Sequence, residues 1–235
     1  KSSLVKSGLL HNIFSGFFTE GTNWRVALMR PGGDPIKYLT EALTEKKSLF
    51  PKVKKTGDTT YQAIIEANLR RSENGLVQVY KEAFGLLQVD SNAGSKKKTD
   101  NLLIVVDQFE ELFRFRKIEK EKNLGVSDAQ HFIKILLTAA QQSEFPIYVL
   151  ITMRSDFLGD CSEFTGLPEA INEGQYLVPR MTRDEIRDCI TRPVAVSTAG
   201  ISPRLVTRLL NDINNDMDQL PVLQHLMMRL WNQWS

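Results

Sequence analysis

The chain has 235 residues, 42% of them hydrophobic and 25% charged, with a formal net charge of +2. This composition is ordinary for a soluble globular protein, and the small net charge gives no argument for nucleic acid or an anionic membrane. No apolar run approaches the ~20 residues of a membrane span, and the first residues lack the apolar core of a signal peptide. Cys161 and Cys189 have no metal-ligand spacing and are expected to be reduced. We therefore expect a soluble, cytoplasmic domain that binds neither nucleic acid nor membranes.

The first half of the chain alternates between helical and strand patterns. Apolar residues at spacings of three and four indicate helices, and short apolar runs bounded by proline, glycine or polar residues indicate strands. In chain order these signals predict a helix at 2–15, a strand at 24–29, helices at about 35–48, 59–71 and 75–87, a polar loop at 90–100, and a strand at 102–106 followed by a helix from near Gln108.

The second half begins in the same way and then becomes wholly helical. Its signals predict a helix from 127 to about 142, strands at 147–152 and 175–178, and helices at about 182–191, 203–214 and 220–233. Strands that alternate with helices form parallel βαβ units, so we expect an α/β fold with a parallel sheet flanked by helices. The change after Pro179 places a boundary near 180, with an α/β core at 1–180 and a helical subdomain at 181–235.

The second strand carries the most informative residues. Five consecutive apolar residues, 102–106, deliver Asp107 at the C-terminal end of that strand. Ligands bind at this edge of an open α/β sheet, and P-loop NTPases use an acid there to hold the Mg²⁺ of a bound nucleotide. The alternative is a surface carboxylate that caps the next helix.

Glu110 and Glu111 follow Asp107 within one helical turn. One of them is expected to orient or deprotonate an attacking water, while the other is a solvated helix residue. The sequence does not decide between the two.

The start of the chain matches the end of a phosphate-binding loop. Such a loop needs glycines whose N–H groups cradle phosphates, a lysine for the β/γ-phosphates and a hydroxyl for Mg²⁺. The chain opens on Lys1-Ser2-Ser3, directly before the first predicted helix. Alone, this tripeptide means little. Its value comes from its position one βαβ unit before the strand that ends at Asp107.

Arg154 ends the third predicted strand, at the same edge of the sheet. A cation there can sense the γ-phosphate or stabilise charge that develops on it. The alternative is an arginine paired with Asp156 or Asp107. Aromatic residues at helical spacing are expected in the core: Phe109, Phe113, Phe115, Trp231 and Trp234.

Together these segments resemble those of the STAND NTPases, specifically the novel STAND branch often found upstream of WD-type or other repeats in bacterial proteins. Residues 1–9 look like the tail of that family's Walker A motif, and residues 105–113 are similar to its Walker B motif, with the acidic pair three and four positions after the metal aspartate. Typical AAA+ proteins place the glutamate directly after the aspartate, where this chain has Gln108. Residues 152–158 look like the sensor strand, and residues 219–225 resemble the proline motif of the helical lid.

The resemblance implies a P-loop NTPase sheet flanked by helices, a C-terminal helical lid, and Mg²⁺ with ATP/ADP, or GTP, as ligands. The implied roles are Lys1, with Ser2 and Ser3, for the nucleotide phosphates, Ser2 and Asp107 for Mg²⁺, Glu110 or Glu111 for the water, Arg154 for the γ-phosphate, and Pro221 beside the base. The glycines of the loop would precede Lys1, so we expect this stretch alone to bind and hydrolyse nucleotide weakly.

A nucleotide-regulated signalling switch is the function that the resemblance implies. Nucleotide binding would hold lid and core in one arrangement, and slow hydrolysis would release them, with fused repeat or effector domains and self-assembly as partners. The alternative is a non-hydrolysing interaction or oligomerisation scaffold, which Gln108 and the absent loop glycines favour. A third interpretation, a DNA-handling AAA+ protein, predicts a basic face that the near-neutral charge does not suggest.

Overall fold

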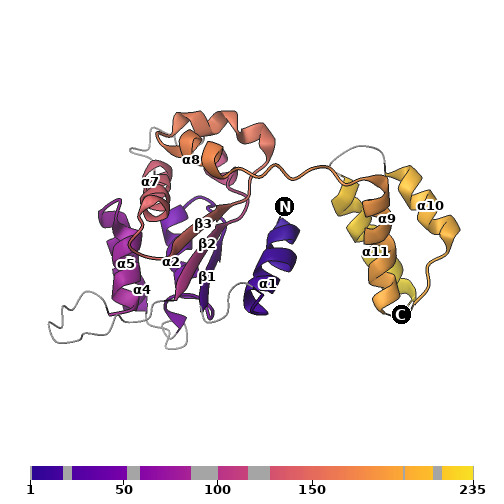
Figure 1. Cartoon of the computed structure of the whole chain (residues 1–235), viewed down its shortest axis with the longest axis horizontal. Coiled ribbons are helices and arrows are strands. Elements are labelled where there is room, and N and C mark those ends of the chain that lie inside the picture. Colours follow the sequence, from indigo (N-terminus) through magenta and orange to yellow (C-terminus); the bar gives the residue numbers. More distant parts are fainter. Residues whose placement is uncertain are drawn as a thin grey trace. The chain divides into compact units, whose positions relative to one another are not determined.

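The structure is a computed structural model that describes residues 2–17, 23–51, 59–85, 100–115, 128–197, 199–213 and 219–234. The chain divides into two compact units, Lys1–Gln175 and Tyr176–Ser235, and each is described by itself (Figure 1). Lys1 and most of the expected polar loop at 90–100 lie outside the described residues.

A parallel sheet forms the centre of the first unit. Its described strands are β1 (Trp24–Met29), β2 (Asn101–Val106) and β3 (Ile147–Ile151), in the order β1-β2-β3. Met29 pairs with Val106, and Val106 with Ile151, so the three strands end side by side. Side chains placed directly after these ends therefore meet at one edge of the sheet.

Helices cover both faces of this sheet (Figure 1). In chain order they are residues 2–14 (π-helical over Leu4–Leu9, then α1, Leu10–Phe14), α2 (Pro35–Leu43), α4 (Thr59–Arg71), α5 (Gly75–Ala83), residues 111–115, α7 (Asp128–Gln141), two 3₁₀ turns (Ser155–Phe157 and Gly159–Glu163) and α8 (Leu167–Gly174). The parallel α/β sheet flanked by helices that the sequence predicts is confirmed.

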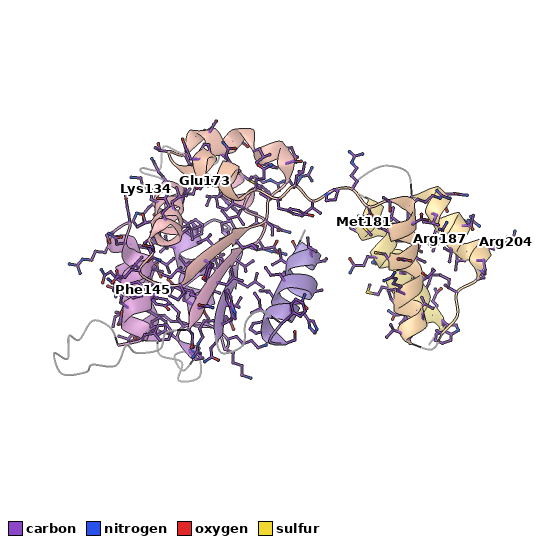
Figure 2. All side chains as sticks on the ribbon, in the orientation of Figure 1. Lys134, Phe145, Glu173, Met181, Arg187 and Arg204 are labelled. Carbon is purple, nitrogen blue, oxygen red and sulfur yellow. The ribbon has the colours of Figure 1, made fainter. Side chains whose placement is uncertain are left out.

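The side chains of β2 show why the sheet is covered on both sides. Leu103 and Val105 point to the face covered by the first helix, where they pack with Val5, Leu10 and Ile13. The alternate residues of the strand join a larger cluster with α2, α4, α5 and α7. A strand buried on both faces reads as a continuous apolar run, which is the pattern of residues 102–106. Figure 2 shows side chains filling the layers on either side of the sheet.

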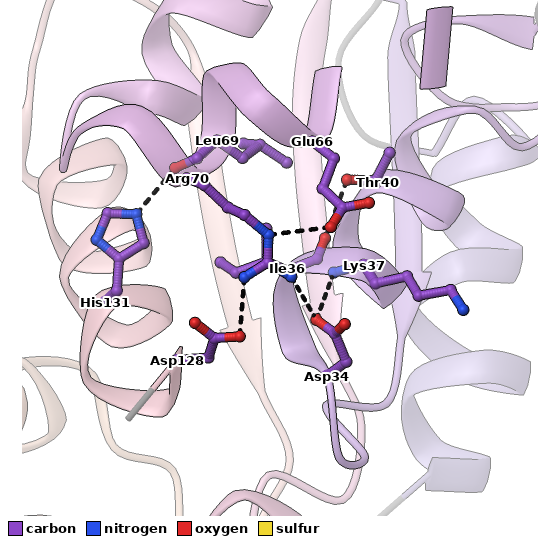
Figure 3. A network of polar contacts seen from close by, with 9 residues as sticks. All are labelled: Asp34, Ile36, Lys37, Thr40, Glu66, Leu69, Arg70, Asp128 and His131. Atoms are coloured by element: carbon purple, nitrogen blue, oxygen red, sulfur yellow. Dashed lines mark hydrogen bonds and ion pairs between the residues drawn. The ribbon is translucent and has the colours of Figure 1, made fainter. Parts of the chain in front are cut away.

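Arg70 ties three helices together on the larger face (Figure 3). From α4 it forms ion pairs with Asp34 at the start of α2 (2.9 Å), Asp128 at the start of α7 (2.8 Å) and Glu66 of its own helix (3.0 Å). Burial lowers the pKa of Arg70, but its bonds to these carboxylates outweigh burial and raise it. These ion pairs hold α4 against the starts of α2 and α7 on this face of the sheet.

The second unit consists of helices α9 (Arg183–Val196), α10 (Pro203–Asp212) and α11 (Gln219–Trp234). Thr182 and Glu185 form a capping box that begins α9, and Ser202 caps α10. The three helices share a small buried apolar cluster: Ile190, Val206, Leu209, Leu210 and Leu223. None of the helices in the described ranges is long and apolar enough to cross a lipid bilayer.

The expected strand at 175–178 is wrong. These residues have no regular secondary structure and pair with no described strand, and Tyr176 and Leu177 are 77% and 64% exposed. A short apolar run becomes a strand only where a neighbouring strand offers hydrogen bonds, and this segment lies where the two units join in the chain.

The boundary between the two units lies close to the one expected from the sequence. The structure divides the chain after Gln175, whereas the sequence pattern places the change at 180.

The expected burial of the aromatic residues is only partly confirmed. Phe109 and Phe113 are buried, but Phe115, Trp231 and Trp234 are exposed by 40%, 39% and 67%. The two tryptophans are not buried because α11 contributes to the cluster of the second unit through other residues, Leu223 and Met227.

The start of the helix after Asp107 also differs from expectation. Residues 107–110 form a turn, so the helix begins at residue 111 and not near Gln108.

Candidate functional site

Asp107 directly follows β2 and is held by the backbone of both neighbouring strands. Its N–H donates to the carbonyl of Met29 (2.9 Å), and the N–H of Thr152 donates to the carbonyl of Val106 (2.9 Å). The carboxylate is 2% exposed. The strand thus carries the acid to the sheet edge where the sequence places it, and the structure shows in addition that the carboxylate is buried there.

Three side chains from distant parts of the sequence converge on this carboxylate. The Ser2 hydroxyl and the Thr152 hydroxyl each donate to Oδ1 at 2.6 Å. The Lys6 ammonium lies 3.3 Å from Oδ2. Ser2 and Lys6 are four residues apart on one helix, a spacing that puts both on the same face. The start of the first helix and the ends of β2 and β3 therefore form one site.

The surroundings of Asp107 keep it ionised. Burial by itself raises the pKa of this carboxyl, because a low-dielectric environment disfavours charge. The hydrogen bonds from Ser2 and Thr152 and the nearby Lys6 ammonium outweigh burial and hold the pKa below its ordinary value. The site is a buried anion whose charge is balanced by one lysine among the described residues.

A strained turn follows the aspartate. Gln108 has φ of 59°, a left-handed conformation that costs a non-glycine residue free energy. The hydroxyl of Thr152 accepts the Gln108 N–H (3.2 Å), and the Thr152 carbonyl accepts the Phe109 N–H (2.9 Å). Thr152 therefore supports both the carboxylate and the turn behind it, and the turn delays the helix to residue 111.

The structure distinguishes Glu110 from Glu111. Glu111 accepts the N–H of Gly32 in the β1–α2 loop (3.2 Å). Glu110 is 8% exposed, and its Oε2 is buried with no hydrogen-bond partner among the residues that the structure describes. A buried acceptor without a partner is costly in a folded protein. Of these two glutamates, Glu110 is thus the one with a buried oxygen still free to accept a hydrogen bond within the described residues.

A pocket of about 360 Å³ opens beside the site, at the end of β1. Its polar lining is Arg30, Tyr38, Glu41, Glu45 and Glu111. Three carboxylates against one guanidinium give this lining a net negative charge, so it repels phosphate groups. A nucleotide phosphate is therefore not expected in this pocket.

Arg154 pairs with Asp156, one of the alternatives that the sequence leaves open. Its Nε and Nη2 lie 3.1 and 3.0 Å from Oδ2 of that carboxylate, and the Arg154 side chain is 52% exposed. An exposed ion pair contributes little free energy and exchanges readily. The pairing with Asp156 is therefore compatible with a role for Arg154 in sensing phosphate.

The remaining expected site residues lie in different places. Ser3 is exposed on the first helical turn, next to Ser2. Pro221 is exposed in the first turn of α11, in the second unit. Lys1 lies outside the described residues.

Sequence reasoning missed Lys6 and Thr152 as members of the site. A signal existed for each: Lys6 is one helical turn from Ser2, and Thr152 directly follows β3 at the edge where β2 ends. Both residues lie within segments that resemble family motifs, but the resemblance assigns a role to neither of them.

The donor atoms at Asp107 fit Mg²⁺. A serine hydroxyl and a carboxylate are the hard oxygen ligands that this cation takes, usually with waters and substrate phosphates completing the shell. Within the described ranges no group of three or more His, Cys, Asp or Glu residues could hold a metal. The described residues thus supply two oxygen ligands at this position, Ser2 Oγ and Asp107, and water or substrate oxygens would complete the shell of a bound Mg²⁺.

Comparison with known proteins identifies the family of the chain. A family model described as Novel STAND NTPase 1 matches residues 1–235, the whole chain. Searches of curated proteins and of solved structures found no match. The chain belongs to the Novel STAND NTPase 1 family.

Proposed function

We propose that this chain is the nucleotide-responsive part of a signalling protein, in which it binds ATP or GTP and hydrolyses it slowly. The observation that carries the proposal is the 2.6 Å hydrogen bond between Ser2 and Asp107. It joins the start of the first helix to the acid-tipped strand, two segments 105 residues apart in the sequence. This is the pair of groups that a magnesium–nucleotide site requires.

The residues of the site would divide the work of binding. Ser2 and Asp107 would hold Mg²⁺, which when bound neutralises charge on the nucleotide phosphates. Lys1 would contact the β/γ-phosphates, with Ser3 beside it at the helix start, where N–H groups favour anions. Arg154 would exchange its exposed partner for the γ-phosphate.

We assign the proton-accepting role to Glu110 in preference to Glu111. Glu111 already accepts the Gly32 N–H, whereas the buried Oε2 of Glu110 has no partner among the described residues. A carboxylate that orients water needs an acceptor oxygen within reach of it.

The switch itself would depend on the second unit. Pro221 would sit beside the base and make nucleotide contacts differ between two arrangements of the protein, as any ligand-driven switch requires. Fused repeat or effector domains would receive the change, and self-assembly would follow it.

Multiple-turnover hydrolysis of ATP and GTP by the full-length protein tests the proposal. Glu110→Gln should reduce the rate about 10²–10⁴-fold, the range for a lost general base, with nucleotide affinity preserved. Glu111→Gln should reduce it less than about tenfold. Glu173→Gln, an exposed carboxylate on α8, serves as the control and should have no effect. No turnover in the unmutated protein would favour the second candidate, a non-hydrolysing scaffold, which Gln108 in place of an acid after Asp107 supports.

A further inference from the structure

The two oxygens of the buried Asp107 carboxylate are used differently. Oδ1 accepts two hydroxyl hydrogen bonds, from Ser2 and Thr152. Oδ2 faces the ammonium of Lys6 at 3.3 Å. Hydroxyl groups bring no net charge, so Lys6 is the group that balances this anion among the described residues.

Lys6 also differs from its partner in exposure. Its side chain is 43% exposed, whereas that of Asp107 is 2% exposed. A lysine is a flexible stem with a strongly hydrated charge, so water can receive the ammonium when it leaves. The carboxylate is fixed at the strand end and has no such freedom. One partner of the ion pair can therefore move and the other cannot.

A divalent cation bound to Asp107 would compete with the ammonium. The Lys6 ammonium lies 3.3 Å from Oδ2, so a divalent cation on the same carboxylate would be close to it. The two positive charges would repel each other strongly, because water screens charges poorly around the buried Asp107 carboxylate. We infer that Lys6 is a displaceable counter-ion: it neutralises Asp107 while no divalent cation is bound and is displaced when one binds. This inference rests on the proposed magnesium role of Asp107.

The consequence is a site that discriminates against free metal. Lys6 lowers the affinity of Asp107 for a divalent cation that arrives alone. A cation that arrives with a nucleotide brings phosphate contacts that offset the displacement. The lysine thus couples metal binding to nucleotide binding and keeps the buried carboxylate neutralised between cycles.

Titration of the full chain with Mn²⁺ alone tests this, with electron paramagnetic resonance reporting free Mn²⁺ at pH 8 and constant ionic strength. Lys6→Gln and Lys6→Met should each bind Mn²⁺ about tenfold more tightly than the unmutated chain. Lys6→Arg keeps the charge and should match the unmutated chain. Lys37→Gln removes an exposed lysine charge on α2 and should also match it. Asp107→Asn should abolish the site in every background.

Different results would overturn the inference for different reasons. Mn²⁺ binding that depends on Asp107 but is equal or weaker in Lys6→Gln and Lys6→Met would refute the counter-ion role alone. Equal tightening in Lys37→Gln would show a general charge effect and would also refute it. If Asp107→Asn removes no binding in any variant, the proposed metal role fails and the inference fails with it.

Discussion

Thr152→Val is the sharpest test of how the site is held together. The hydroxyl donates to Asp107 Oδ1 at 2.6 Å and accepts the Gln108 N–H at 3.2 Å, in a residue that is 8% exposed. Valine has the same shape, so the change removes the hydroxyl and leaves the packing. A hydrogen bond to a charged group contributes about 1.5–3 kcal/mol, and a donor left without a partner adds about 1 kcal/mol. We expect a loss of about 2–4 kcal/mol in the free energy of unfolding.

The pH dependence of this loss follows from the charge on Asp107. Its pKa in the folded protein lies below its ordinary value, so the stability that these bonds supply is present above the unfolded pKa of about 3.9. That stability disappears as the pH falls through the folded pKa. The difference between Thr152→Val and the unmutated chain should therefore be full at pH 7 and shrink below about pH 4.

Urea unfolding followed by circular dichroism measures both effects. Thr40→Val is a matched control, because Thr40 is also buried but donates to a neutral carbonyl, that of Ile36. We expect its cost to be about 1 kcal/mol or less and independent of pH. If Thr152→Val costs no more than Thr40→Val, or if its cost is the same at pH 7 and pH 3.5, the Thr152 hydroxyl does not stabilise the ionised Asp107 carboxylate.

Three further substitutions probe the scaffold, each by urea unfolding. Arg70→Ala removes three ion pairs and should cost about 1–3 kcal/mol, whereas Arg208→Ala removes an exposed pair with Asp212 and should cost below about 0.5 kcal/mol. Equal costs would show that Arg70 does not hold α2, α4 and α7 together. Gly32→Ala should cost about 1–2 kcal/mol, because Gly32 has φ of +50° and a Cβ there would lie 2.7 Å from Tyr38 Cε2. A neutral result would mean that the loop relaxes. Gln108→Gly should stabilise by up to about 1 kcal/mol, because it relieves a φ of 59°, and a loss would show that the Gln108 side chain matters.

The sheet could be predicted from the sequence because its strands carry strong local signals. The run 102–106 is apolar throughout and ends at an acid, and residues 24–29 are closed by a turn rich in proline and glycine. Such segments keep their structure in almost any α/β context. The segment 175–178 has a weaker signal of the same kind and forms no strand, because whether it pairs depends on a neighbour that the local sequence does not specify.

The site could be predicted only in part, for a related reason. Asp107 is marked by its own strand, but its contacts with Lys6 and Thr152 depend on how three distant segments align. Sequence spacing gives the register within one helix and not between elements. Glu110 and Glu111 could not be separated either, because the left-handed turn at Gln108 shifts the start of the helix and sets which carboxylate is buried.

Calorimetric titration shows whether Asp107 and the start of the first helix form a magnesium–nucleotide site. The full-length protein is titrated with ATP and with ADP in the presence of Mg²⁺. We expect binding that Asp107→Asn weakens at least tenfold and that Glu173→Gln, an exposed control, leaves unchanged. Binding of equal strength in Asp107→Asn, or no binding in the unmutated protein, would show that Asp107 does not form such a site.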